Sequence, residues 1–271
     1  MLSNVRLERI NIRCSFVHWG NLRPQTPYKC SALGVSVQKE NIQIFSIYGY
    51  HYFRRSNSHV EKLEFNHHPW STYLPNGFGK FFSNLVDMEV HHTPLKALRR
   101  KNFEDMLKLK RLSIDETNLT SIQEETFYDL LSLEELSITN SFLSSLPTNI
   151  FSMLKNLRLF DGKYNKLTAL ESQLFSRNFQ VEVINFIGNQ LREIHINFSQ
   201  FKNITEIYFL DCHCLNSFFV KGGPIVTLKD FQNLVKKKCG MSENDIVKKS
   251  LTKVIKCSFT SKLIDDSNCI I

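Results

Sequence analysis

The 271-residue chain lacks several features that define large protein classes. It has no run of about 20 apolar residues, so we expect no membrane span. Ten Gly and seven Pro are too few for a long linker, which predicts one continuous structural unit. There is no G-x-S-x-G, H-E-x-x-H or phosphate-loop motif. We therefore predict a protein that is not an enzyme, with no catalytic residue, resident metal or cofactor.

The opening sequence, MLSNVRLERINIRC, also lacks the apolar stretch of about 7–15 residues that a secretory signal peptide needs. Either the signal peptide is missing from the sequence as given, or the compartment inferred below is wrong. The first interpretation is favoured, because the cysteine pattern is harder to produce by accident.

Cysteine is absent between Cys30 and Cys212 but frequent in the flanks, at Cys14, Cys30, Cys212, Cys214, Cys239, Cys257 and Cys269. Thiols that serve as small apolar side chains would be scattered. Clustering at both ends predicts disulfide-closed caps and hence an extracellular or lumenal compartment. A four-thiolate zinc site is the alternative, but these spacings do not form two C-x-x-C hooks. Cys269 is left over, which indicates a free thiol or a disulfide-linked dimer.

The net charge of +8 is concentrated in the flanks. Residues 1–59 carry a surplus of six positive charges and residues 215–271 a surplus of five, whereas residues 60–214 carry a deficit of three. A nucleic-acid binder more often gathers Lys and Arg on one face with interleaved aromatic residues, so we expect no nucleic-acid partner. Contact of the basic flanks with an anionic glycan or a membrane surface remains an alternative.

The middle of the chain has a period of 24 residues. From Leu85, apolar residues follow at offsets +3, +5, +10, +13, +18 and +21, and the same offsets recur from Leu109 and Leu133. Further units start at Leu157, Val181 and Ile204, and a looser one leads from Val60. Each unit reads as a short strand, whose +3 and +5 residues point inward, followed by a return segment. One unit cannot bury its own apolar face, so the units must stack.

Residues at the same offset in successive units form columns in the stack, and three offsets predict specific structural features. The +18 column should form an aromatic spine under the convex side: Phe103, Phe127, Phe151 and Phe175. The +8 column should hydrogen-bond the neighbouring backbone: Thr93, Thr117, Ser141, Asn165, Asn189 and Cys212. Gly162 replaces the large apolar residue expected at +5, which indicates a bulge or a close approach.

At these residues the chain resembles the leucine-rich-repeat family, in its 24-residue extracellular subtype. The resemblance implies an α/β-type repeat solenoid, a horseshoe with a parallel concave sheet, an irregular or short-helical convex side and cysteine caps at both ends. We expect an N-terminal cap with short strands over residues 1–59, repeats over 60–211, and a C-terminal cysteine-rich flanking cap and tail over 212–271. The overall pattern is also similar to secreted leucine-rich immune proteins of insects.

The caps resemble the family's flanking domains. This implies Cys212–Cys239 and Cys214–Cys257 disulfides in the C-terminal cap. Cys14 and Cys30 look like a reduced N-terminal cap with one disulfide. The stretch that holds Ile42, Ile44 and Ile47 alternates loosely, which predicts an edge strand covering the first repeat.

Function is expected on the concave face, where the +2, +4, +6 and +7 residues point away from the core. The candidate binding residues are Asp87, Glu89, His91, Arg111, Asp115, Glu135, Leu159, Asp161, Tyr164, Ile187, Tyr208 and Leu210. Exposed apolar and Tyr side chains in the last units favour a protein ligand. The resemblance suggests a secreted recognition protein in immunity, cell-surface adhesion or signalling, and a structural role in the extracellular matrix is the alternative.

Polar residues suggest a metal or pH-sensing site and three glycosylation sites. The N-terminal end of the face, with His67, His91 and His92, could bind a metal or sense pH, although solvated strand residues explain it more simply. Sequons at Asn118, Asn197 and Asn203 predict a glycoprotein.

Overall fold

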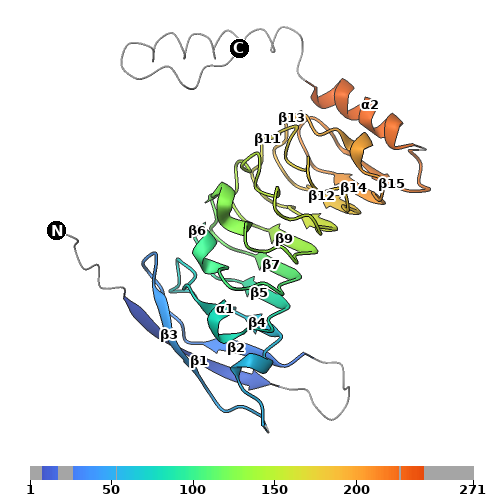
Figure 1. Cartoon of the computed structure of the whole chain (residues 1–271). Coiled ribbons are helices and arrows are strands. Elements are labelled where there is room, and N and C mark those ends of the chain that lie inside the picture. The colour runs from blue at the N-terminus through green and yellow to red at the C-terminus, as the bar shows by residue number, and fades with distance from the viewer. Residues whose placement is uncertain (1–7, 18–26, 53, 226, 241–271) are drawn as a thin grey trace, which may run out of the picture.

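The computed structural model describes residues 8–17, 27–52, 54–225 and 227–240. The described part is a curved stack of short strands with a cap at each end (Figure 1). Eleven strands form one sheet in the order β15-β14-β12-β10-β9-β7-β5-β4-β2-β1-β3. Their bounds in chain order are β1 (Arg9–Val17), β2 (Lys29–Leu33), β3 (Gln43–Tyr48), β4 (Lys62–Glu64), β5 (Asp87–His91), β7 (Arg111–Asp115), β9 (Glu135–Thr139), β10 (Leu159–Asp161), β12 (Val183–Asn185), β14 (Glu206–Phe209) and β15 (Ser217–Val220).

The strands from β4 to β14 are parallel, and equivalent repeat positions lie side by side. Arg111 pairs with Glu135, and Leu159 pairs with Val183, at the same offset in each unit. The return segments hold two small parallel sheets, β6 (Ala97–Leu98) with β8 (Ser121–Ile122) and β11 (Ala169–Leu170) with β13 (Glu193–Ile194). They also hold α1 (Phe78–Phe81) and the 3-10 turns η1 (Asn57–His59), η2 (Arg100–Asn102), η3 (Glu124–Phe127) and η4 (Phe198–Gln200). The predicted solenoid with an irregular convex side is confirmed.

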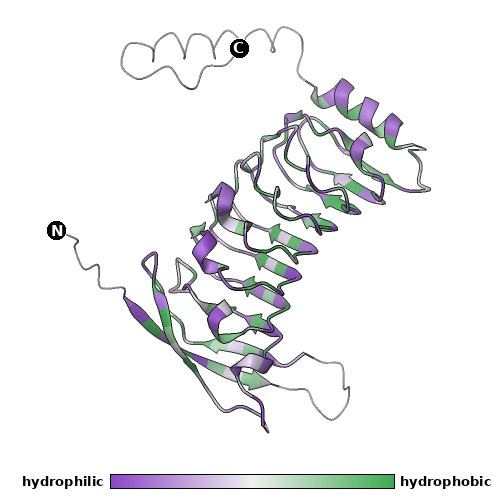
Figure 2. Cartoon of the chain, viewed as in Figure 1, coloured by the Kyte–Doolittle hydropathy of each residue, from purple (hydrophilic) through white to green (hydrophobic). Residues whose placement is uncertain are grey.

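The repeat offsets define the core. The +3 and +5 residues of β5, Met88 and Val90, are fully buried, as are the equivalent residues of neighbouring units. Hydrophobic and hydrophilic residues alternate along the strands, as the coloured bands of β5, β7 and β9 show (Figure 2). This alternation follows from the period of two in a strand, and it sends one set of side chains inward and the other onto the concave face.

The predicted Phe column is buried throughout. Its rings meet in tilted pairs: the centroids of Phe103 and Phe127 are 5.7 Å apart and those of Phe151 and Phe175 are 5.1 Å apart. Gly162 allows a close approach. A Cβ atom there would lie 2.7 Å from a ring carbon of Phe160, so the aromatic ring at +3 fills the space that a +5 side chain normally occupies.

The buried +8 column hydrogen-bonds backbone between units. Asn165 Nδ2 donates to the carbonyl of Ile138, and Asn189 Nδ2 donates to those of Gly162 and Phe186, at 2.8–3.0 Å. The hydroxyl members make fewer bonds, because each carries a single donor. Thr117 and Ser141, for example, bond each other at 2.8 Å.

The +7 residues all adopt the left-handed backbone conformation, with φ between 48° and 67°: His67, His92, Glu116, Asn140, Tyr164, Gly188 and Asp211. Sequence reasoning missed this column because only one member is Gly. The other residues accept the strain because the same turn ends every strand and feeds the +8 side chain inward.

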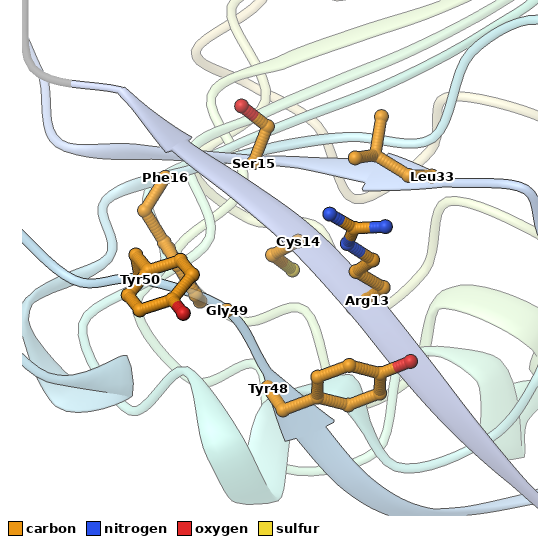
Figure 3. A pocket seen from close by; sticks show the side chains of 8 residues that line it. All are labelled: Arg13, Cys14, Ser15, Phe16, Leu33, Tyr48, Gly49 and Tyr50. Atoms are coloured by element: carbon orange, nitrogen blue, oxygen red, sulfur yellow. The ribbon is translucent and has the colours of Figure 1, made fainter.

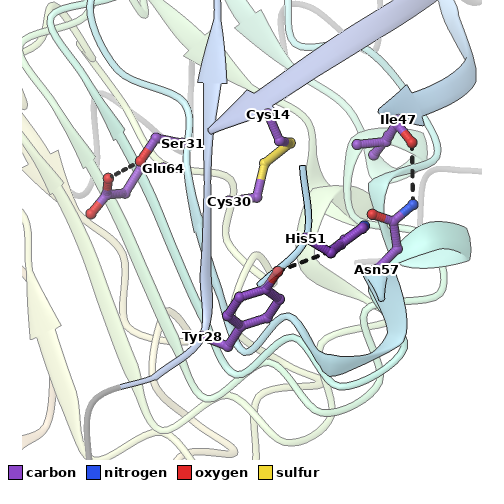
Figure 4. Close-up of a disulfide and its surroundings, with 8 residues drawn as sticks. All are labelled: Cys14, Tyr28, Cys30, Ser31, Ile47, His51, Asn57 and Glu64. Carbon is purple, nitrogen blue, oxygen red and sulfur yellow. Dashed lines mark hydrogen bonds between the residues drawn. A yellow bond between two sulfur atoms is a disulfide. The ribbon is translucent and has the colours of Figure 1, made fainter. Parts of the chain in front are cut away.

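The N-terminal cap is a continuation of the concave sheet. β1 pairs antiparallel with β2 and parallel with β3, and β2 pairs parallel with β4. A disulfide joins Cys14 to Cys30, and Cys30 lies opposite Leu63 in the register (Figure 4). The Ile-containing stretch is an edge strand, β3, as predicted, and it meets the first repeat at its return segment, where Ile44 N donates to Asn76 O at 3.0 Å and Asn76 N donates to Ile42 O at 2.9 Å. The strand of the first repeat, β4, pairs instead with β2, whose buried Cys30 and Ala32 continue the core columns of the array.

The C-terminal cap consists of β15, antiparallel to β14, and the helix α2 (Leu228–Cys239). The Thr227 side chain caps the helix, and Phe231 and Val235 are buried on its inner face. The structure joins Cys214 to Cys239 and leaves Cys212 a free, buried thiol.

The predicted Cys212–Cys239 bond is therefore wrong, and so is the predicted partner of Cys214. Cys212 occupies the +8 position, where its side chain points into the array, whereas Cys214 lies beyond the last ladder position and meets the end of α2. Cys257 and Cys269, including the predicted intermolecular bond of Cys269, lie outside the described residues.

Candidate binding face

The concave face of the sheet carries the +2, +4 and +6 side chains, and it has two unlike halves. β4, β5, β7 and β9 present charged and polar residues, whereas β10, β12, β14 and β15 present several apolar ones. All of the predicted binding residues belong to units that line this face, which runs along the stack from cap to cap (Figure 1).

Charged groups in the first half pair with one another across adjacent strands. Lys62 Nζ contacts Glu89 Oε1 at 2.5 Å, and Arg111 Nε contacts Asp87 Oδ2 at 3.1 Å. His92 Nδ1 lies 2.6 Å from Glu116 Oε2. The charges of Lys62 and Arg111 are therefore matched by partners on the protein itself, without a ligand.

Asp115 is the most heavily bonded of these residues. Its carboxylate accepts hydrogen bonds from the Thr139 hydroxyl and the Asn140 amide, and His91 Nδ1 lies 3.6 Å away. Burial opposes ionisation, but the bonds from Asn140 and Thr139 outweigh it, so the pKa of Asp115 falls below its usual value. Asp115 therefore acts as a fixed anion that ties β7 to β9.

The histidines at this end have different surroundings. The rings of His67 and His92 stack with centroids 4.7 Å apart, on the left-handed turns after β4 and β5. His68 is buried against Phe65, and burial lowers its pKa to about 4. Within the described residues, no group of three His, Cys, Asp or Glu side chains is placed to hold a metal ion.

The second half of the face presents an apolar surface, which we call the apolar patch. Its residues come from neighbouring strands and the turns that follow them: Leu159, Val183, Ile187, Tyr208, Leu210, Phe218 and Val220. Tyr208 lies opposite Phe218 in the register, and their rings stack with centroids 6.2 Å apart. Each side chain remains partly exposed.

Asx turns border this patch. Asp161 Oδ1 accepts from the backbone N–H of Lys163, and Asn185 Oδ1 accepts from that of Ile187. These turns directly follow β10 and β12, which have three residues each.

Sequence reasoning placed Asp161, Tyr164, Ile187, Tyr208 and Leu210 on the second half of the face but missed Phe218 and Val220. The short apolar run at residues 218–220 was a usable strand signal, but the antiparallel return of β15 after the last repeat is not part of the repeat pattern. Tyr164 is half exposed on its left-handed turn and packs against Gly188, where a Cβ atom would lie 2.3 Å from the Tyr164 ring.

The three sequon asparagines are exposed. The Asn197 side chain caps η4 by accepting from Ser199 N, and Asn203 Nδ2 donates to Gln180 Oε1 at 3.1 Å. Glycosylation at Asn118, Asn197 and Asn203 stays a prediction.

The repeats match a known family. A family model described as leucine rich repeat matches residues 83–140, the part of the chain with the most regular offsets. The chain therefore contains leucine-rich repeats. No curated protein sequence matches it significantly.

Solved structures share the repeat fold of this chain. A chain of the TLR13–ssRNA13 complex is 18% identical with a TM-score of 0.53, over 57% of this chain and 22% of that one. A chain of the glycosylated Drosophila Toll–Spatzle complex is 19% identical with a TM-score of 0.50, over 56% of this chain and 20% of that one. This chain thus spans about a fifth of the length of each. Within the described residues, no helix is long and apolar enough to cross a membrane.

Proposed function

We propose that this chain is a non-enzymatic, extracellular recognition protein that binds a protein ligand on its concave face. The observation that carries the proposal is the apolar patch on β10, β12, β14 and β15. Apolar and aromatic side chains with a polar rim are the usual composition of the centre of a protein–protein interface. Here Glu135 on the neighbouring strand β9 and Asp211 after β14 provide that rim.

The charged half supports a protein ligand over a nucleic acid. The basic residues Lys62, Arg111 and Lys163 of the concave face are each held by an acidic neighbour, so the repeats present few unpaired cations on this face to neutralise phosphates. In this proposal the charged half orients the bound ligand, because charges at the rim of an interface affect specificity more than affinity.

The compartment and process rest on the disulfides and the fold. Cys14–Cys30 and Cys214–Cys239 fit an oxidising compartment. One of the similar structures is a Toll–Spatzle complex, which makes recognition in innate immunity the leading process, with cell-surface adhesion or signalling beside it.

The test is to capture ligands from extracellular fluid of the source organism with three immobilised proteins. These are the wild type, the double variant Leu159→Glu/Ile187→Glu, and the control Phe179→Glu, which changes an exposed aromatic residue on a return segment. A purified ligand should bind the wild type and the control equally and the double variant at least tenfold more weakly. Equal binding to all three, or cross-links confined to the convex side, would overturn the proposal.

A further inference from the structure

The N-terminal cap has a hollow that the proposed function does not use. It has a volume of about 630 Å³ and is lined by Arg13, Cys14, Ser15, Phe16, Leu33, Tyr48, Gly49 and Tyr50. This size lies within the range of about 300–1,000 Å³ that is typical of small-molecule sites. β1 supplies its polar wall, and the end of β3 and the residues after it supply its aromatic wall (Figure 3).

Arg13 is the chemically distinctive residue of this hollow. The register places it between Leu33 on β2 and Tyr48 on β3, and all three side chains are exposed. No acidic residue lines the hollow, and Arg13 has no ion-pair partner among the described residues. Lys29, in the same cap, is by contrast bound by Glu64 at 2.8 Å. The guanidinium of Arg13 is thus available to an anion from outside.

Gly49 lets the backbone between the two tyrosines lie against β1. A Cβ atom on this residue would lie 2.2 Å from the carbonyl oxygen of Cys14 and 2.9 Å from the Phe16 ring, so only glycine lets the chain lie so close to β1. Gly49 also has φ of 157°. The Tyr48 side chain is 53% exposed and that of Tyr50 is 96% exposed. Two aromatic side chains are therefore presented to solvent beside one free cation.

We infer that this hollow binds a carboxylated saccharide. One free guanidinium matches one carboxylate, with which it forms paired charge-assisted hydrogen bonds. The hydroxyls of Ser15, Tyr48 and Tyr50 have no partner among the described residues and can bond sugar hydroxyls. The exposed aromatic rings and Leu33 offer apolar contact to the C–H faces of a sugar ring. An acidic peptide would more often need several free cations.

The test uses a hyaluronan hexasaccharide, which carries glucuronate, and the same hexasaccharide with its carboxyl groups reduced. Calorimetry at 150 mM NaCl should show binding of the first and at least tenfold weaker binding of the second. Arg13→Gln should weaken binding at least tenfold, because the neutral amide cannot form the paired charge-assisted hydrogen bonds with the carboxylate. Tyr50→Ala should weaken it severalfold.

Arg177→Gln is the matched control, because Arg177 is exposed and lies in the repeat unit that starts at Leu157, outside the N-terminal cap. It should bind like the wild type. The Leu159→Glu/Ile187→Glu variant should also keep full saccharide binding, which separates this site from the proposed ligand face. The inference is overturned if the wild type does not bind, if the reduced hexasaccharide binds equally, if Arg13→Gln has no effect, or if hexaglutamate binds as tightly.

Discussion

The Sγ atom of Cys212 lies 3.3 Å from the carbonyl oxygen of Phe186, a carbonyl to which Asn189 in the preceding unit also donates. Cys212 is thus the last member of the +8 column rather than part of the C-terminal disulfide. Burial raises the pKa of its thiol, which keeps it protonated and unreactive at neutral pH.

This placement predicts the behaviour of two variants. Cys212→Ala should keep the Cys214–Cys239 disulfide and lower the free energy of unfolding by about 1–2 kcal/mol, through the lost contact and hydrogen bond. Cys214→Ala should instead free the Cys239 thiol. Peptide mapping and urea unfolding give the two readouts, and a reduced Cys239 in Cys212→Ala would contradict the assignment.

We expect a larger side chain at Gly162 to overpack the core and destabilise the fold. Gly162→Ala places a methyl group 2.7 Å from the Phe160 ring, so we expect a loss of about 1–3 kcal/mol in unfolding free energy. The double variant Phe160→Leu/Gly162→Ala should cost less than the sum of the two single changes, because the smaller side chain makes room. Additive losses in urea denaturation would show that the two positions do not compete for the same space.

We expect His68 to make the free energy of unfolding depend on pH. Its pKa of about 4 in the folded chain lies below the ordinary 6.5, so the unfolded chain binds more protons between these values. The contribution of His68 is fully present above pH 6.5 and is lost as the pH falls to about 4. The difference is at most about 3 kcal/mol.

The measurement is the unfolding free energy of wild type and His68→Leu from pH 4 to 7.5. The variant should lose less stability on acidification than the wild type. His213→Gln, a change at an exposed histidine, should follow the wild-type curve. Parallel curves for wild type and His68→Leu would refute the prediction.

We expect Glu64 to stabilise the junction between the N-terminal cap and the repeat array. Its carboxylate accepts from the Ser31 hydroxyl at 2.6 Å (Figure 4). It also accepts from Lys29 Nζ at 2.8 Å, and the two bonds join β4 to β2. Burial opposes ionisation, but these bonds prevail and lower the pKa of Glu64. The stabilisation is therefore present above pH 4.5 and lost as the pH falls through the lowered pKa.

Glu64→Gln should reduce stability by about 1 kcal/mol near neutral pH and have a smaller effect in acid. Hydrogen exchange should show faster opening of β1 and β2 in this variant while β9 keeps its protection. Uniform acceleration along the whole chain would mean that Glu64 is not specific to the junction.

The sequence by itself determined the solenoid. Offsets such as Met88 and Val90 on a strand and Phe103 on the return segment recur in each unit, and stacking is the way such units bury their apolar sides. The offsets also determined which residues face outward, so Leu159, Ile187 and Tyr208 could be placed on the concave face before their neighbours were known.

The tertiary structure decided how the ends close and how the face divides. Cys212 and Cys214 are both candidates for a disulfide in the sequence, but the inward direction of the +8 side chain removes the first. β2 pairs with the first repeat strand, β4, because its buried residues continue the core columns, whereas β3 meets the return segment of that repeat at Asn76. The hollow beside Arg13 is formed by β1, β2 and the end of β3 in the N-terminal cap, outside the repeat pattern, so the periodicity could not reveal it.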